Sequence, residues 1–273
     1  MIAVTGATGN VGRALVATLV RAGETVTAVA RRIGVEDVPP GVRPVAADLG
    51  EPQSLTPALE GAKALFLLVA GEDPGGILRR AAAAGVAKVV LLSSQGVGTR
   101  PDTYTHAGRF EAAVAESGLP FTVLRSGGLA SNALAWAEPV RRYRTAAAPF
   151  ADVALPFVDP DDVAAVAAAV LREHGHDGAT YTLTGPEPTT PRRRAAAIAA
   201  ALGEPVTFVE QSREEARAQL VRFMPPAIAE GTLDVLGAPT PEEQAVGADV
   251  ARLLGRPATP FSVWAARNVA AFR

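Results

Sequence analysis

The chain has 273 residues and a formal net charge of −2, and 48% of its residues are hydrophobic while 20% are charged. This composition is typical of a packed globular protein. Basic residues do not outnumber acidic ones, which argues against nucleic acid as the main partner. With no cysteine and three histidines, the chain cannot form disulfides or thiolate metal sites, and we expect no bound metal.

The chain lacks the patterns that direct proteins to membranes. Its longest apolar run, Val163–Leu171, is far shorter than the roughly 20 residues of a membrane-spanning helix. A strand pattern begins at Ile2, without the charged and apolar regions of a signal peptide. We therefore expect a cytoplasmic protein with no membrane partner.

The first 125 residues alternate between short aliphatic strand patterns and amphipathic helical patterns. Strands are expected at Ile2–Thr5, Thr25–Ala30, Val42–Ala46, Ala64–Ala70, Lys88–Ser93 and Phe121–Leu124. Helices are expected at Asn10–Arg21, Ser54–Leu59, Gly76–Ala84 and Thr105–Ser117. Strands that are apolar on both faces and alternate with helices are typical of a parallel sheet covered on both sides.

The alternation becomes looser in the second half of the chain. Elements are expected as a strand at Leu155–Val158, a helix over residues 159–173, a strand at Thr180–Leu183, a helix at Thr190–Leu202, a strand at Val206–Val209 and proline-broken helices over Arg213–Arg273. We predict an α/β fold, with a Rossmann-type doubly wound parallel sheet over residues 1–155. A smaller C-terminal substrate lobe over residues 156–273 packs on it as part of one structural unit.

The strongest local signal is a glycine-rich turn between the first strand and the first helix. Its glycines follow the spacing G-x-x-G-x-x-G. Such a turn bends tightly, lets the backbone approach a diphosphate and lets the helix pack close to the strand. Unpaired amides at the helix start stabilise phosphates. The residues predicted to bind a dinucleotide here are Gly6, Thr8, Gly9, Asn10, Val11 and Gly12.

Two arginines at the end of the second strand indicate which dinucleotide binds. Sites that prefer NAD usually carry an acidic residue there, which bonds the ribose hydroxyls, whereas this chain has Arg31 and Arg32. A guanidinium group pairs well with a 2′-phosphate. We therefore predict NADP(H) in preference to NAD(H), with solvated surface charges as the alternative interpretation of one or both arginines.

Three further strand ends are expected to complete the cofactor site. Asp48 and Leu49 end the third strand beside the expected adenine ring, and a turn or helix-capping carboxylate explains Asp48 equally well. Val69 and Ala70 end the fourth strand, and Ser93 ends the fifth. The ligands of doubly wound sheets bind at the carboxyl ends of the strands.

A series of further motifs runs through the chain in order. They are Thr5–Gly12, Val89–Gly96, His106 with Glu111, Ser117–Arg125, Phe157–Asp159 before Asp162–Ala164, Tyr181–Pro186 and Gly255–Pro257. Together they resemble the NmrA-like family of atypical short-chain dehydrogenases/reductases, from end to end of the chain. The resemblance implies an extended Rossmann fold, a substrate cleft beside a smaller lobe, and activities such as NAD(P)H-dependent quinone reduction.

A catalytic pair of the wider superfamily is missing. Short-chain dehydrogenases typically use Tyr-x-x-x-Lys, in which the lysine lowers the pKa of the tyrosine. Here Tyr104 has Gly108 at the position of that lysine, and neither lysine of the chain, Lys63 or Lys88, lies on this segment. The Tyr–Lys mechanism is therefore nearly excluded, and we interpret Tyr104 as an ordinary packing residue.

Three polar residues are the candidates for catalysis near the expected nicotinamide. Ser94 ends the fifth strand, His106 lies at the start of the next helix, and Asn132 follows the sixth strand. Histidine is a suitable proton donor near neutral pH, and a hydroxyl or an amide can orient a carbonyl. A packed helix-start histidine and a turn serine are equally good explanations of His106 and Ser94.

The missing pair indicates the class of substrate. Quinones and conjugated enones accept a hydride with little acid catalysis, because the oxyanion that forms is delocalised. We predict an NADPH-dependent oxidoreductase that acts on a small quinone-like or aromatic molecule, including tailoring steps of secondary metabolism such as reductive coupling. The alternative is a non-catalytic NADP(H) sensor that regulates a partner protein. The sequence leaves the substrate and a homo-oligomeric state open.

One charged run stands apart from these motifs. Arg192, Arg193 and Arg194 open an alanine-rich helix. Such a run is typical of a solvated helix face. We predict that these three arginines form a solvated helix face; the alternative is that they bind a partner or an anionic substrate.

Overall fold

The computed structural model describes all 273 residues, which divide into two compact units built from interleaved segments. The first unit comprises Met1–Ser126, Pro160–Leu183 and Asp249–Gly255; the second comprises Gly127–Asp159, Thr184–Ala248 and Arg256–Arg273. This division differs from the single boundary expected after residue 155, because the helix and the strand within residues 160–183 complete the first unit.

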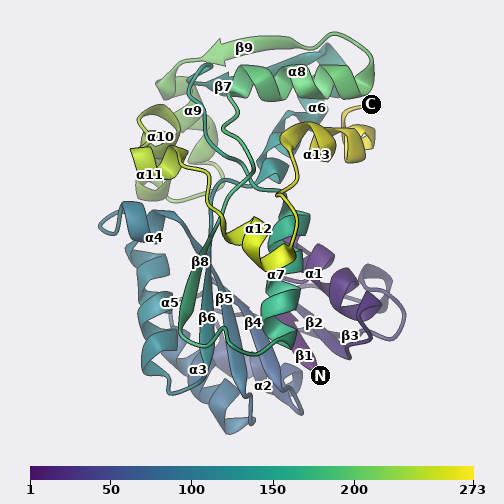
Figure 1. Cartoon of the computed structure of the whole chain (residues 1–273), viewed down its shortest axis with the longest axis vertical. Coiled ribbons are helices and arrows are strands. Elements are labelled where there is room, and N and C mark those ends of the chain that lie inside the picture. Colours follow the sequence, from purple (N-terminus) through teal and green to yellow (C-terminus); the bar gives the residue numbers. More distant parts are fainter. The chain divides into compact units, whose positions relative to one another are not determined.

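A seven-stranded sheet forms the centre of the first unit, in the order β3-β2-β1-β4-β5-β6-β8 (Figure 1). Its strands are β1 (Ile2–Thr5), β2 (Val26–Ala30), β3 (Arg43–Ala46), β4 (Ala64–Leu68), β5 (Lys88–Ser94), β6 (Phe121–Ser126) and β8 (Ala179–Leu183). All neighbouring strands are parallel. The strand order reverses between β1 and β4, as in Rossmann folds, so the predicted fold class is confirmed.

Helices cover both faces of this sheet. The helical elements of the first unit are α1 (Asn10–Arg21), η1 (Val35–Asp37), η2 (Pro52–Leu55), α2 (Thr56–Leu59), α3 (Pro74–Ala83), α4 (Gly96–Thr99), α5 (Thr105–Glu116), α7 (Pro160–Arg172) and α12 (Asp249–Leu254). Helix α1 packs along α7, which also contacts α12, whereas α3 packs beside α5. Because helices shield both faces from water, the central strands are mainly apolar, and Leu65, Phe66 and Leu91 are fully buried.

Local sequence explains where the best predicted helix begins and ends. Helix α1 has the predicted bounds and buries Leu15, Val16 and Leu19 along one side, which is the pattern of an amphipathic helix. Gly23 follows it with φ of 81°, a left-handed conformation in which glycine commonly ends helices.

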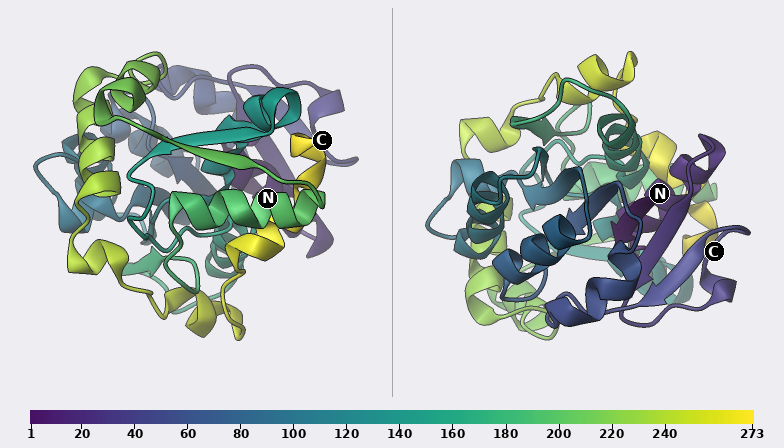
Figure 2. Two further views of the ribbon diagram at one scale, coloured as in Figure 1. Left: turned by 90° about the horizontal axis from the view of Figure 1, so that it is seen from above. Right: turned by 90° about the horizontal axis from the view of Figure 1, so that it is seen from below.

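The second unit contains a small parallel sheet of β7 (Thr145–Pro149) and β9 (Thr207–Gln211). Helix α8 (Pro191–Leu202) contacts both strands and lies along them in the left view of Figure 2. The other helical elements are η3 (Ala130–Trp136), α6 (Ala137–Tyr143), α9 (Arg213–Leu220), α10 (Pro226–Gly237), α11 (Pro241–Gln244), α13 (Phe261–Arg267) and η4 (Val269–Phe272). The core is aromatic and includes Trp136, Phe261, Trp264 and Phe272.

In this part of the chain one predicted strand is wrong and one strand was missed. The segment expected as a strand at Leu155–Val158 makes only isolated bridges, from Leu155 to Thr189 and from Leu129 to Val158. Strand β7 was not predicted, because three of its five residues are alanine and it ends in proline, a composition of low strand propensity.

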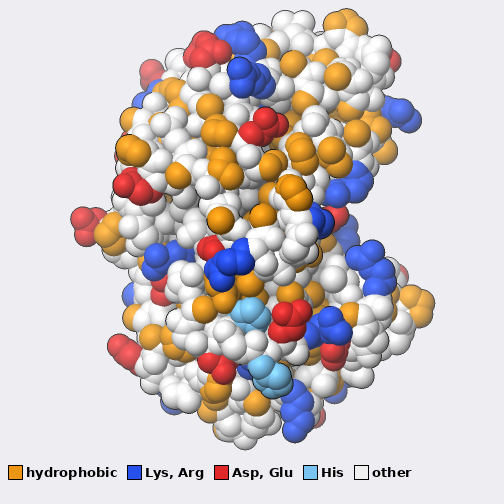
Figure 3. Space-filling view, in the orientation of Figure 1, with side chains coloured by type: hydrophobic (Ala, Val, Ile, Leu, Met, Phe, Trp, Pro, Cys, Tyr) orange, Lys and Arg blue, Asp and Glu red, His pale blue; other side chains and the backbone are white.

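The surface carries mixed charge. Figure 3 shows basic and acidic side chains interspersed over one face of the molecule, without a continuous basic patch there. None of the helices combines the length and the apolar character that crossing a bilayer requires.

Candidate functional site

A cleft opens in the first unit where β1, β2, β3 and β4 end, which is where the sequence predicts the cofactor. Its empty space amounts to about 1220 Å³, part of it open to solvent. The lining residues are Thr5, Gly6, Thr8, Gly9, Val29, Ala30, Arg31, Arg32, Ala47, Asp48, Leu49, Leu68, Ala70 and Gly71. This set includes predicted residues from the glycine turn and from the ends of β2, β3 and β4.

The glycine turn forms a cradle that side chains would fill. Gly6 has φ of 64°, and a Cβ on it would lie 2.1 Å from the Leu68 Cδ1 atom. A Cβ on Gly12 would lie 2.1 Å from the Gly6 carbonyl oxygen. The amide of Arg13 makes the bond to the Gly9 carbonyl, at 2.9 Å, and no side chain caps the helix start. The amides of Asn10, Val11 and Gly12 in the first turn of α1 are therefore available to a phosphate.

Arg31 and Arg32 lie beside this cradle, immediately after β2. Both side chains are exposed and line the cleft. Neither forms an ion pair or a side-chain hydrogen bond with the rest of the chain. Two unpaired guanidinium groups at this position fit a 2′-phosphate. The cleft therefore fits NADP(H) at both its diphosphate and its adenosine ends.

Asp48 lines the cleft and also holds a turn. Its Oδ1 accepts a hydrogen bond from the Gly50 amide at 2.8 Å, and the Ser54 hydroxyl donates to its carbonyl oxygen at 2.9 Å. The turn interpretation therefore accounts for the side-chain oxygen that bonds the amide, while the contact with adenine stays a prediction.

Several residues of the cleft were missed from the sequence. Gly71 has φ of 80°, and a Cβ on it would lie 2.3 Å from the Leu49 carbonyl oxygen. Arg13 donates from Nη2 to the Thr8 carbonyl at 3.1 Å, which places its guanidinium beside the glycine turn. A glycine directly after the fourth strand and an arginine directly after the third glycine were the available signals.

Five residues predicted to bind the cofactor are not among those that line this cleft: Asn10, Val11, Gly12, Val69 and Ser93. The first three can act through their backbone amides at the helix start. Val69 packs against the core under α3 and α5, and the Ser93 hydroxyl donates to Glu111 Oε1 at 2.6 Å. Their roles in binding the cofactor stay predictions.

Glu111 is the centre of a part-buried polar network. Arg125 donates from Nη2 to Glu111 Oε2 at 2.6 Å and from Nε to Oε1 at 3.1 Å. The Glu111 and Arg125 side chains are 13% and 27% exposed. Ser93 and Arg125 are the next-to-last residues of β5 and β6, and Glu111 lies on α5. The network therefore joins these three elements at the carboxyl ends of the strands, where Ser94 lies.

His106 lies on the second residue of α5, and its environment defines its hydrogen bonds. Its Nδ1 is 3.1 Å from Arg109 Nη2 and 3.8 Å from Glu72 Oε1. Because an arginine only donates, Nδ1 accepts, and a neutral imidazole ring then carries its proton on Nε2. The hydrogen bond from Arg109 also lowers the pKa of Glu72, so this carboxylate remains negative beside the ring.

The other two catalytic candidates occupy different surroundings. Ser94 is partly buried at the end of β5, and its hydroxyl accepts from the Gly96 amide at 3.2 Å. The structure therefore brings Ser94 and His106 to the same edge of the first unit. Asn132 is an exposed residue of η3 and belongs to the second unit. The catalytic roles of all three stay predictions.

The residues that could have formed a Tyr–Lys pair have other partners. The Tyr104 ring lies against Gly96, where a Cβ would come within 2.3 Å of it. Gly108 occupies the next turn of α5 and has no side chain. Lys88 opens β5 and donates from Nζ to the carbonyls of Val170 and Glu173, at the end of α7. Both lysines lie at the amino ends of strands, opposite the cleft edge.

The parallel sheet, its switch point and the glycine cradle define a dinucleotide-binding Rossmann protein. A model of the family described as NAD(P)H-binding matches residues 6–174, and the chain belongs to this family. Together with the reductases described next, this match confirms the resemblance to NmrA-like atypical short-chain dehydrogenases/reductases and the prediction of an NAD(P)H-dependent oxidoreductase.

Similar proteins of known activity cover the whole chain. A (4-alkanoyl-5-oxo-2,5-dihydrofuran-3-yl)methyl phosphate reductase of Streptomyces griseus is 38% identical over 288 residues, covering 100% of this chain and 99% of the relative. An NAD(P)H azoreductase of Xenophilus azovorans is 32% identical over 284 residues, with 100% and 99% coverage. The crystal structure of an NADPH-dependent quinone oxidoreductase of Escherichia coli with NADPH is 27% identical, with a TM-score of 0.79 and coverage of 98% and 99%.

Proposed function

We propose that the protein uses NADPH to reduce a quinone or another strongly conjugated carbonyl compound of secondary metabolism. The first unit combines a complete cofactor cleft with an incomplete catalytic pair. The cleft presents a phosphate cradle and two unpaired arginines, whereas the position of the usual catalytic lysine is Gly108. Such a site binds and orients a reduced dinucleotide but has no strong acid to protonate a simple alkoxide.

Named residues would hold the cofactor and the substrate. The amides at the start of α1 hold the diphosphate, and Arg31 and Arg32 hold the 2′-phosphate. When bound, NADPH supplies a hydride to the acceptor. The Nε2–H group of His106 can donate a hydrogen bond to the substrate oxygen, and the Ser94 hydroxyl can orient the same carbonyl. The hydride brings two electrons to the acceptor, and a proton from water completes the reduction, because a neutral imidazole that released its own proton would become an imidazolate.

Two relatives support a strongly electrophilic acceptor. The name of the Streptomyces griseus enzyme denotes an unsaturated lactone with an alkanoyl group on the ring double bond. Two carbonyl groups on one alkene delocalise the charge that a hydride adds, as the two carbonyls of a quinone do. The Escherichia coli enzyme is named for quinones. Reductive coupling of two such monomers stays a prediction.

The direct test is a panel of acceptors, read as loss of NADPH absorbance with the purified protein. We expect turnover of 1,4-naphthoquinone and of an α-acyl butenolide, with NADPH preferred to NADH. Oxidation of plain secondary alcohols with NADP, and no reduction of conjugated acceptors, would contradict the proposal. Tight binding of NADPH with no turnover of any acceptor would instead favour the non-catalytic sensor.

A further inference from the structure

A buried arginine in the second unit lacks the partners that buried charges normally have. Arg194 lies in the first turn of α8 and is 6% exposed. Its Nε has no hydrogen-bond partner, and no carboxylate pairs with it. Arg192 and Arg193 are exposed, so the prediction of a solvated face is wrong for Arg194 alone. Buried charges without partners are costly and call for an explanation.

Aromatic rings offset only part of this cost. The Arg194 guanidinium carbon lies 3.8 Å from the centre of the Phe157 ring and 5.5 Å from that of Trp136. Cation–π contacts of this kind are attractive, but they leave the N–H groups at the edge of the guanidinium without acceptors. Burial lowers the pKa of Arg194 to about 10, so the group is still charged at neutral pH. The positive end of α8 disfavours a cation there.

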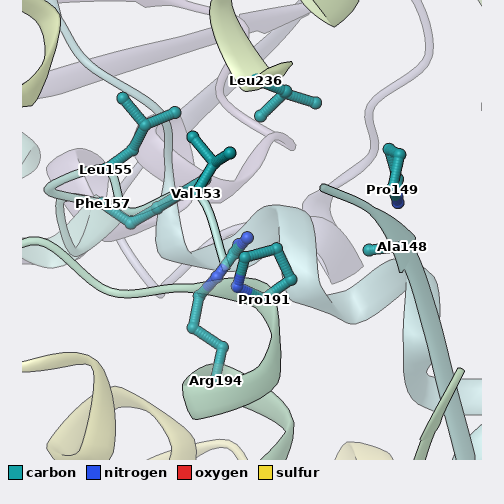
Figure 4. Close-up of a pocket in the computed structure, with 8 residues that line it drawn as sticks. All are labelled: Ala148, Pro149, Val153, Leu155, Phe157, Pro191, Arg194 and Leu236. Carbon is teal, nitrogen blue, oxygen red and sulfur yellow. The ribbon is translucent and has the colours of Figure 1, made fainter. Parts of the chain in front are cut away.

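The guanidinium faces a cavity with apolar walls. Figure 4 shows its end pointing into the space between Val153, Leu155, Pro191 and Leu236. The cavity is small, about 280 Å³ when the adjoining open solvent is included, and Arg194 is its one charged lining residue. A second buried polar group without a partner is the hydroxyl of Thr189, the residue that pairs with Leu155. Unpaired polar groups therefore gather beside this cavity.

We propose that the cavity is a binding site for the carboxylate group of a short-chain aliphatic acid. The edge of a guanidinium donates two parallel hydrogen bonds to a carboxylate, which supplies the acceptors that Arg194 lacks. The apolar walls accommodate an alkyl chain. A single cation matches a single negative charge, so a dianionic phosphate fits less well. The site lies wholly within the second unit, and its proposal does not depend on the proposed reductase activity.

The test is calorimetric binding of hexanoate, hexan-1-ol and hexyl phosphate to the full-length protein without NADPH. We expect hexanoate to bind most tightly and the Arg194→Met variant to bind it at least about tenfold more weakly, which is the effect of losing a charge-assisted hydrogen bond. Arg193→Met removes an exposed arginine from the same turn and is the matched control, with unchanged affinity. Hexanol should bind all three proteins equally.

A second measurement needs no variant. Hexanoate should raise the melting temperature of the wild-type protein more than hexanol at the same concentration, because it binds the folded state. The proposal would be overturned if the wild-type protein did not bind hexanoate at millimolar concentration. It would also be overturned if Arg194→Met bound hexanoate with the same affinity as the wild type. Tighter binding of hexyl phosphate than of hexanoate would overturn the assignment of a single negative charge.

Discussion

The glycine turn of the first unit and the first turn of α8 in the second unit both leave hydrogen-bond donors without acceptors in the chain. In the glycine turn the donors are backbone amides at the start of α1, at an open cleft. In α8 the donor is one side chain, Arg194, which is 6% exposed. The first arrangement costs little because water reaches the amides, whereas the second carries a burial penalty that the aromatic rings around Arg194 offset only in part.

This difference shows that unpaired donors indicate a ligand more strongly when they are buried. Solvent satisfies an exposed amide, so the glycine turn needs its motif and its family to support a function. Solvent does not reach the Nε atom of Arg194, which has no partner in the chain.

The largest effect is expected from Gly12→Ala. Because its Cβ would lie 2.1 Å from the Gly6 carbonyl oxygen, the turn must shift, and we expect NADPH affinity to fall by more than about a hundredfold, or roughly 3 kcal/mol. Titration calorimetry with NADPH measures this. The control is Gly108→Ala in α5, where nothing lies closer than 4.0 Å and alanine should stabilise the helix by about 0.5–1 kcal/mol. If both variants bound NADPH with the same affinity, the glycine turn would not be the site that binds the diphosphate.

Arg31→Ala should act on one cofactor only. Losing a charge-assisted contact with the 2′-phosphate is expected to weaken NADPH binding by about tenfold to a hundredfold, whereas NADH, which lacks that phosphate, should bind as before. Parallel titrations of the variant with both nucleotides give the ratio. If NADH affinity falls by the same factor, Arg31 supports the fold of the cleft and does not select the cofactor.

Arg194→Met should stabilise the protein while it abolishes carboxylate binding. Removing an unpaired buried charge is expected to raise the free energy of unfolding by about 1–3 kcal/mol at neutral pH. Burial lowers the folded-state pKa of Arg194 to about 10, below its ordinary value, so the penalty is complete below pH 10 and disappears as the pH rises above this value.

Urea denaturation at neutral pH and at about pH 11 measures this difference. The stability gap between the variant and the wild type should narrow at the higher pH. A destabilised Arg194→Met protein would show that the guanidinium has structural partners that outweigh its burial.

Tyr104→Phe should have the smallest effect. The ring packs on Gly96, and no lysine lies one turn further along α5, so the hydroxyl is not expected to donate the proton. Steady-state kinetics with a quinone should give a kcat within about twofold of the wild type, since this is well under the effect of removing a general acid. A loss of a hundredfold or more would restore tyrosine as the acid and contradict the substrate argument.

The fold of the first unit was largely predictable because local and long-range requirements agree there. Strand β1 and helix α1 have the predicted bounds, since apolar runs, glycines and helix periodicity all indicate the same elements. The sequence could not show that β8 joins β6 at the sheet edge, because a strand pattern does not name its neighbour.

The second unit was less predictable for physical reasons. Leu155 and Val158 are buried without belonging to a strand, so an apolar run was taken for one. The alanines of β7 form a strand through pairing with β9, where tertiary contacts outweigh propensity. Arg194 could not be separated from Arg192 and Arg193 by sequence, because burial of one arginine in a run depends on the rings that meet it.

The return of residues 160–183 to the first unit has a consequence for synthesis on the ribosome. When Ser126 has emerged, β6 still lacks its outer neighbour β8, and α1 lacks α7. The nascent sheet therefore exposes an unpaired edge and an apolar face, both of which invite association with other chains. Contacts between α1 and α7 join segments far apart in sequence, which slows folding. The residues of the nucleotide cleft are synthesised early, but the sheet that supports them is complete only after more than half of the chain has been made.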